Sequence, residues 1–217
     1  RTEVIAINQS SGDIYIIGTI EGNDKNMTLL KYNSSGDLEF AKVWENNIDQ
    51  EGHGIVLSDT HVYVTGMKEV IGAAPDNQAL ITKLDPQGNE IWTKTWGGGA
   101  EEYGQAIAIN SNEDVYIMGK SASFGGGDAD IFLLKYNKTG DFKKVRIIDY
   151  AESHALDSGY GIDLDSQGLI YLGGYTESSG TGRALLMKFN DTGSSFDSIW
   201  NATYGSGDYR EYCLDVY

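Results

Sequence analysis

The sequence predicts an all-β fold, a β-propeller built of four-stranded antiparallel blades. Two short blocks of residues recur four times along the 217-residue chain. One block is an apolar run with Tyr in second place and Gly in the last, as in 14–18, and the other has a Lys followed two residues later by Asn or Asp. The lysines of the second block are Lys31, Lys83, Lys135 and Lys188, with separations of 52, 52 and 53 residues. A fixed period of about this length is typical of propeller blades.

Each repeat is predicted to contain four short strands. In chain order these are a Gly- and Ala-containing strand such as 103–109, the Tyr block, the Lys block and a segment around a Trp. Trp44, Trp92 and Trp200 are interpreted as one recurring position of the fourth strand, near which the third repeat has 145–146. Val, Ile, Tyr and Trp bounded by Asn, Asp, Gly and Ser favour strands and turns. No long segment shows a helical period, so we predict no long helix.

Consecutive apolar residues, as in 106–109 and 131–134, indicate sheets that are covered on both faces. We therefore predict one propeller region over 1–217, with repeats at approximately 1–50, 51–100, 101–156 and 157–207 and the start of a fifth at 208–217. Because a fifth innermost strand would compete for one position in a four-bladed ring, we expect an arc of a ring of roughly six to eight blades. A sandwich of two sheets is the alternative, but it does not account for the period.

The composition excludes several classes of partner and site. The formal net charge of −16, from 32 acidic and 16 basic residues, argues against nucleic acid and anionic membranes as partners. One cysteine, Cys213, excludes a disulfide within the chain and a zinc site made of cysteines. No stretch is long and apolar enough for a membrane helix, so we expect no direct membrane insertion.

The motifs resemble the SBBP-type β-propeller repeat. The resemblance is clearest in the third repeat, with Tyr-Gly-x-Ala-Ile-Ala at 103–108, Val-Tyr-x-x-Gly at 115–119, a Gly- and Asp-rich loop at 123–130 and Leu-Leu-Lys-Tyr-Asn-x-x-Gly-Asp at 133–141. This family is common in secreted and surface proteins of archaea and bacteria. The resemblance implies a propeller in an extracellular or cell-surface location, and it implies no shared catalytic residues. A weaker similarity links 85–92 to the Asp-x-x-Gly-x-x-x-Trp docking motif of quinoprotein-type propellers.

The connections between the predicted strands differ in length. The first-to-second and third-to-fourth connections are short, whereas the second-to-third and the inter-repeat connections are longer and share the opposite face, here called the long-loop face. Binding residues concentrate on variable loops held by a rigid frame. Aromatic rings beside carboxylates suit a sugar or a cationic protein patch. The ligand-binding candidates on this face are Phe124, Asp128, Asp130, Tyr150, His154, Tyr175 and Glu177.

We predict no catalytic residues, no metal site and no cofactor. The adjacent pair at 101–102 would point to opposite faces of a strand, which does not suit a pair of glycosidase carboxylates. The histidines have no ligand spacing. Asp128 and Asp130 offer oxygen ligands suited to calcium, but their spacing is shorter than a full cation loop, and a solvated loop is the favoured interpretation.

Six Asn-x-Ser/Thr sequons exceed the number expected by chance from the composition, although Asn also recurs in one type of turn for its own reasons. The glycosylation candidates are Asn8, Asn26, Asn33, Asn137, Asn190 and Asn201. The leading hypothesis is a non-enzymatic extracellular or cell-surface propeller for ligand binding, adhesion or surface architecture through its long-loop face. Its partners would be surface glycans or proteins, or further blades of a parent chain. The alternative is a propeller domain of an enzyme, either a quinoprotein-like oxidoreductase or a polysaccharide-active enzyme.

Overall fold

The computed structural model describes residues 4–45, 47–72, 76–126, 128–150, 156–178, 181–205 and 213. The described chain is all-β and forms four separate four-stranded antiparallel sheets. The predicted fold class is therefore confirmed. Among the described residues, no helix is long and apolar enough to span a membrane.

The four sheets, here called blades 1 to 4, follow one another along the chain. Blade 1 contains β1 (Val4–Ile7), β2 (Ile14–Glu21), β3 (Lys25–Tyr32) and β4 (Leu38–Val43). Blade 2 contains β5 (Gln50–Leu57), β6 (Val62–Glu69), β7 (Asn77–Leu84) and β8 (Glu90–Trp96). Blade 3 contains β9 (Glu102–Ile109), β10 (Val115–Ser121), β11 (Asp130–Tyr136) and β12 (Phe142–Ile148). Blade 4 contains β13 (Asp157–Leu164), β14 (Ile170–Ser178), β15 (Thr181–Asp191) and β16 (Phe196–Tyr204).

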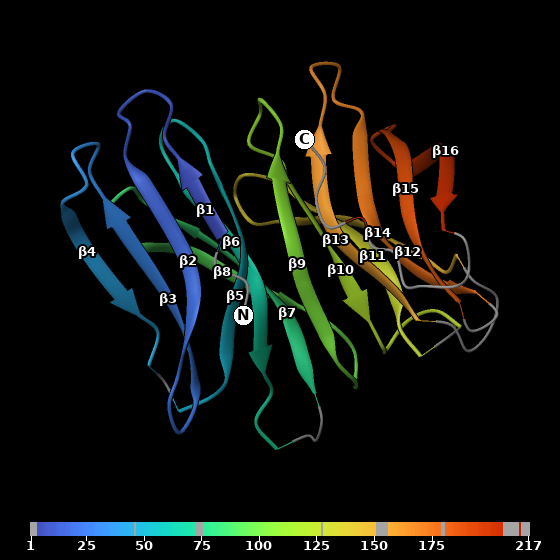
Figure 1. The fold of residues 1–217 in the computed structure, drawn as a ribbon, viewed down its shortest axis with the longest axis horizontal. Coiled ribbons are helices and arrows are strands. Elements are labelled where there is room, and N and C mark those ends of the chain that lie inside the picture. Colours follow the sequence, from blue (N-terminus) through green and yellow to red (C-terminus); the bar gives the residue numbers. More distant parts are fainter. Residues whose placement is uncertain are drawn as a thin grey trace.

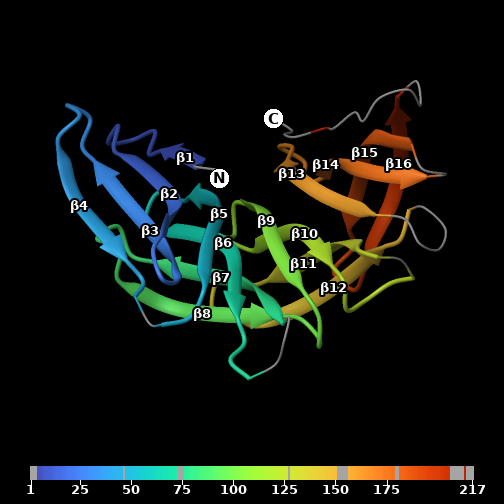
Figure 2. The same cartoon turned by 60° about the horizontal axis from the view of Figure 1, so that its bottom comes forward.

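The blades are arranged as an open arc of a propeller (Figures 1 and 2). Within each blade the strands pair in chain order. The first strand of a blade also packs on the preceding blade: β5 contacts β1, β2 and β3, and β13 contacts β9, β10 and β11. Figure 2 shows blades 1 and 4 at the two ends of the arc, with blades 2 and 3 between them. The arc agrees with the prediction, and the number of blades in the whole ring stays a prediction.

The hydrophobic core is divided into three clusters, one at each junction between neighbouring blades. Strand β6 shows how a middle blade serves two of them, because it is buried without interruption from Val62 to Met67. Val64 belongs to the cluster shared with blade 1, whereas Tyr63 belongs to the cluster shared with blade 3. Successive residues of a strand point to opposite faces, so this continuous apolar run is buried on both sides.

The repeated Tyr and Lys form one cross-strand pair in every blade. Tyr15 lies opposite Lys31, and the lysine Nζ stands 5.5 Å from the centre of the tyrosine ring. The equivalent distances in blades 2, 3 and 4 are 5.0, 5.1 and 4.6 Å. A cation above an aromatic face is stabilised by the ring quadrupole. The two sequence blocks therefore recur together because their central side chains contact each other.

A bulge near the start of the innermost strand recurs in blades 2, 3 and 4, where the pairing register shifts directly after Gly52, Gly104 and Gly159. A side chain at any of these positions would collide with the preceding blade. The side chain would collide with Ile17 at Gly52, with Thr65 at Gly104 and with Met118 at Gly159. These three obstructing residues occupy the same repeat position in the second strand of their blades. Glycine is required here by the close approach of two blades.

The predicted equivalence of three tryptophans is only partly correct. Trp92 and Trp200 both lie opposite the strand lysine of their blade, but Phe40 takes that position in blade 1. Trp44 follows the end of β4 and matches Trp96 instead, since both pair with the residue four places before the lysine. The aromatic position in blade 1 is filled by Phe, so the next Trp along the chain was mistaken for it.

The predicted fifth repeat, 208–217, lies outside the described residues except for Cys213. The Cys213 backbone N–H donates a hydrogen bond to the Gly174 carbonyl at 3.1 Å. Gly174 holds the position in β14 that Gly66 holds in β6, and the Gly66 backbone borders Gly104 of the following blade. Cys213 therefore approaches blade 4 where the innermost strand of blade 3 approaches blade 2.

Candidate functional site

The long-loop face is less uniform than the sequence predicted. The connection from β2 to β3 spans only 22–24, and β14 and β15 are separated by two residues, because the strands of these blades continue pairing almost to the hairpin ends. The longer connections on this face are 70–76, 122–129 and the segments between blades. The prediction of long second-to-third connections is thus wrong for blades 1 and 4.

The predicted aromatic ligands fall into different environments. Phe124 is 39% exposed, and its ring packs on that of Trp96 with 5.0 Å between centroids. Tyr150 is half-buried against the core, and its hydroxyl donates to the Asn201 side chain at 3.1 Å. Tyr175 is only 1% exposed and packs against Gly182. Its assignment as a ligand contact is therefore wrong, because β14 extends through this position and turns the ring inward.

The predicted polar ligands also separate. Asp128 is exposed, whereas Asp130 at the start of β11 is 2% exposed. Glu177 is half-buried, and its backbone N–H donates to the Leu156 carbonyl at 3.0 Å. His154 lies outside the described residues. The interpretation of 123–130 as a solvated loop therefore agrees with Asp128 and is wrong for Asp130, because Asp130 begins β11 and is buried.

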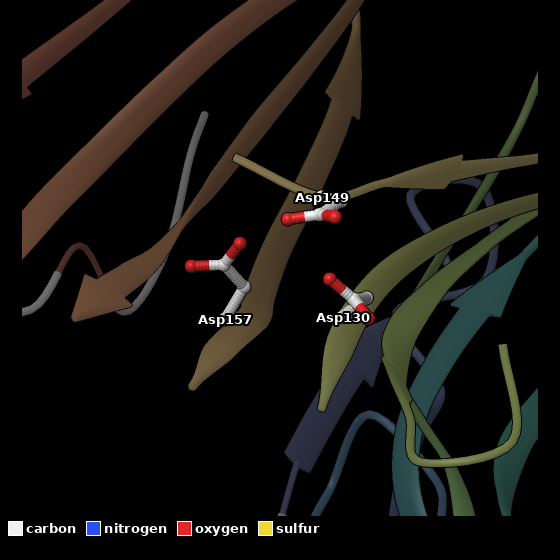
Figure 3. A group of neighbouring side chains, drawn as sticks. All are labelled: Asp130, Asp149 and Asp157. Carbon is white, nitrogen blue, oxygen red and sulfur yellow. The ribbon is translucent and has the colours of Figure 1, made fainter. Parts of the chain in front are cut away.

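Asp130 instead joins two other acidic residues, Asp149 after β12 and Asp157 at the start of β13. Figure 3 shows the three side chains gathered between blades 3 and 4. One carboxylate oxygen from each lies within 4.8 Å of the others. Asp130 and Asp157 are buried and Asp149 is exposed. We call this group the carboxylate cluster. Asp157 Oδ2 accepts a hydrogen bond from the Tyr150 backbone N–H at 2.8 Å, which fixes the start of β13 against the connection from blade 3.

A second feature lies on the opposite face, where the tight turns emerge. An open groove of about 1110 Å³ runs across the β1–β2, β5–β6 and β9–β10 turns and reaches the β11–β12 turn. Its lining is rich in amides and hydroxyls. The exposed polar residues that line it include Gln9, Asp59, Thr60, Ser111, Asn112 and Lys138. The sequence reasoning missed this groove, because the turns are short and the concavity arises from the placement of three blades around the arc.

Glu113 lines this groove, and its φ of +60° lies in the left-handed region that favours glycine. The β1–β2 and β13–β14 turns have Gly12 and Gly168 in this conformation. The Glu113 carboxylate accepts hydrogen bonds from Tyr63 at 3.0 Å and Lys83 at 3.2 Å. Burial alone would raise the pKa of Glu113, but its hydrogen-bond donors hold that pKa at about 2. The group stays ionised at neutral pH, which suits an anchor for Lys83 and not a proton donor.

Three of the sequons lie in tight turns and three within strands. Asn8 and Asn137 line the groove, and their side-chain oxygens accept backbone N–H groups of their own turns. Asn33 caps its turn in the same way. Asn190 lies within β15 and not in a turn, because the last hairpin of blade 4 pairs further than its equivalents. Asn26 is half-buried in β3, whereas Asn201 in β16 is exposed.

The fold places the chain in the class of β-propellers, and one of the solved structures that match it supports this. An endo-arabinase from Bacteroides thetaiotaomicron VPI-5482 superposes with a TM-score of 0.52 at 9% identity, over 95% of this chain and 81% of that chain. A eukaryotic initiation factor aligns with a TM-score of 0.43 at 6% identity, over 93% of this chain and 55% of that chain. At such identities the likeness to the endo-arabinase extends to the fold alone.

Among curated proteins, the regulatory protein FlaEY of Caulobacter vibrioides (strain ATCC 19089 / CIP 103742 / CB 15) is 29% identical over 113 residues. The match takes in 46% of this chain and 12% of that protein's length. No family model matches the sequence. These similarities do not assign an activity.

Proposed function

We propose that the chain is part of a non-enzymatic, extracellular or cell-surface propeller that binds a hydroxyl-rich ligand, such as a surface carbohydrate, in the groove across its tight turns. The observation that carries the proposal is the groove itself, which presents amides and hydroxyls from three successive blades on one surface. Amide and hydroxyl side chains both donate and accept hydrogen bonds, as sugar hydroxyls do.

The charge of the groove narrows the ligand class. Asp59, Glu113 and Asp114 line it, and Lys138 is the one cation among the described lining residues. An anionic ligand would meet repulsion there, and the net charge of −16 adds to it. A neutral glycan avoids this cost. The resemblance to SBBP-type repeats and the number of sequons support the surface location.

A glycan array probed with the 217-residue protein, followed by calorimetric titration with the strongest oligosaccharide, tests the ligand class. We expect Gln9→Ala and Asn112→Ala to weaken binding about threefold or more each, since both exposed side chains line the groove. Gln167→Ala is the matched control, because Gln167 occupies the same type of exposed turn in blade 4 but does not line the groove. The proposal fails if no glycan binds, or if the control weakens binding as much as the groove variants do.

The two groove sequons add a second test. A glycan attached to Asn8 or Asn137 would cover the groove, so the proposal requires both to be unmodified. Asn190 and Asn201 are exposed and lie outside the groove, so both are accessible to modification. Mass spectrometry of native material should therefore find Asn8 and Asn137 bare, and high occupancy at either would overturn the groove as the binding site.

A further inference from the structure

The carboxylate cluster has an internal reference, because the junction between blades 2 and 3 has the same backbone arrangement as the junction between blades 3 and 4. In the earlier junction the Gly98 N–H donates to Glu102 Oε2 at 2.7 Å. In the later one the Tyr150 N–H donates to Asp157 Oδ2 at 2.8 Å. Glu102 and Asp157 both stand at the start of an innermost strand and both are fully buried. The two junctions therefore share a backbone arrangement and differ in their side chains.

At the earlier junction, the buried carboxylate of Glu102 accepts hydrogen bonds from protein donors. Glu102 Oε1 accepts hydrogen bonds from the Ser121 hydroxyl at 2.9 Å and the Ser123 N–H at 3.0 Å. Gly97 and Gln78 complete the surroundings: a side chain at Gly97 would start 3.0 Å from Gln78 and directly against the Glu102 carboxylate. One carboxylate occupies this place in the junction, and both of its oxygens have partners.

The later junction replaces these neutral neighbours with acids. By strand register, Asp149 stands in the place of Gly97 and Asp130 in the place of Gln78. Asp149 therefore projects from the position that borders both other side chains, in agreement with the convergence in Figure 3. Three carboxylates now occupy the space that holds one in the earlier junction. Such a concentration of like charge, two-thirds of it buried, favours a bound cation.

Thr176 supplies an independent observation. It pairs directly with Asp157 across β13 and β14, just as Ser121 pairs with Glu102. Residues directly opposite in an antiparallel pair point to the same face, so the Thr176 side chain lies on the cluster side of the sheet. Thr176 is 1% exposed, and its hydroxyl has no hydrogen-bond partner among the described residues. Ser121 reaches its carboxylate, whereas the hydroxyl of Thr176 is left with an open bonding position beside the cluster.

The loop over the cluster is also shaped to it. Gly125 has a φ of +109° and lies so close to the Asp130 carboxylate that a side chain there would collide with it. A side chain at Gly126 would stand 2.8 Å from the Asp149 carboxylate. Both glycines thus bring bare backbone against two of the three acids, and no larger residue fits at Gly125.

From these observations we infer that Asp130, Asp149 and Asp157, with the hydroxyl of Thr176, form a calcium-binding site that joins blades 3 and 4. Calcium takes six to eight oxygen ligands at about 2.3–2.6 Å, so two of its ligands lie at most roughly 5 Å apart. The cluster oxygens meet this limit. Its ligands are all oxygens, which disfavours zinc and copper, and three carboxylates exceed the one or two that magnesium usually takes. The exposed side of Asp149 leaves room for water ligands.

Calorimetric titration of the 217-residue protein with CaCl₂ at fixed ionic strength tests the inference. Extracellular calcium modules bind with a Kd of roughly 10⁻⁴–10⁻³ M, so the titration must extend to several millimolar. We expect one site, and a rise in the melting temperature on adding calcium that EDTA reverses. Asp149→Asn, at an exposed position, should weaken binding about tenfold or more without loss of the fold, which circular dichroism checks. MgCl₂ should bind about tenfold more weakly, and equal binding would overturn the assignment to calcium.

Two further variants separate a site from diffuse attraction to an acidic protein. Asp128→Asn removes the same charge from the same loop but lies outside the cluster, and it should change the Kd less than about twofold. Thr176→Val replaces the hydroxyl with a methyl group, and it should weaken calcium binding severalfold. The same change should stabilise the calcium-free protein, because it removes a buried hydroxyl that has no hydrogen-bond partner there. Absence of calcium binding, or equal effects of Asp128→Asn and Asp149→Asn, would overturn the inference. Unchanged affinity in Thr176→Val would overturn the role of the hydroxyl.

Discussion

Single residues in this chain adopt costly conformations where they tie neighbouring blades together. Glu113 in the β9–β10 turn has the positive φ that glycine adopts in two equivalent turns, which for other residues costs on the order of 1 kcal/mol. Its carboxylate binds Lys83 and Tyr63 of the preceding blade. The contacts between blades offset the strain in the turn.

This arrangement predicts a specific dependence on pH. The folded pKa of Glu113 is about 2, below the value of about 4.3 for an unfolded chain, so its contribution is present above pH 4.5 and is lost as the pH falls toward 2. Glu113→Gln should be less stable than wild type at pH 7, by on the order of 1 kcal/mol after solvent screening. The difference should vanish near pH 2. Urea unfolding at both pH values measures it, and a difference that does not change with pH would contradict the ion pair.

The strand elements could largely be predicted from the sequence, because the Tyr and Lys blocks are cross-strand partners and repeat as a unit. Two features could not. The equivalence of Phe40 with Trp92 requires the strand register, since a Trp occurs four residues further on. The residues around Asp149 do not mark it as a site residue. It stands out only when the repeats are aligned by strand register, because the previous repeat has Gly97 at this position. Column-by-column comparison of the repeats could have found it.

The innermost strands pack through glycines, which gives a prediction for a single element. Gly104→Ala places a methyl group against the Thr65 hydroxyl and 3.1 Å from the Gly66 carbonyl, so we expect a loss of about 2 kcal/mol in the free energy of unfolding. Gly99→Ala is the control, because no atom lies within 4 Å of the added methyl. Adding Thr65→Ala to Gly104→Ala should recover part of the loss. Additive effects in this double variant, measured by urea unfolding, would refute the contact.

At the scale of the whole molecule, the end blades differ from the middle ones. Strand β6 is buried on both faces, whereas β2 in blade 1 alternates between buried and half-exposed residues. Large apolar side chains are exposed on both end blades, with Ile5 at 59% and Trp200 at 39%. The prediction that the sheets are covered on both sides is thus correct for the middle blades of the arc only. A closed ring of blades has no end faces, so these surfaces are suited to further sheets or to a second copy of the chain.

We therefore expect the 217-residue chain to associate reversibly in solution through its end blades. The net charge of −16 opposes association, so raising the salt from 0.05 to about 0.5 M should strengthen it by screening. Ile5→Lys combined with Trp200→Lys should give a monomer in sedimentation velocity runs over a range of concentrations. Ile71→Lys, at a residue 77% exposed in the β6–β7 connection of a middle blade, should behave as wild type. A wild-type chain that stays monomeric at high salt would contradict this prediction, because the end blades would then remain exposed to solvent without association.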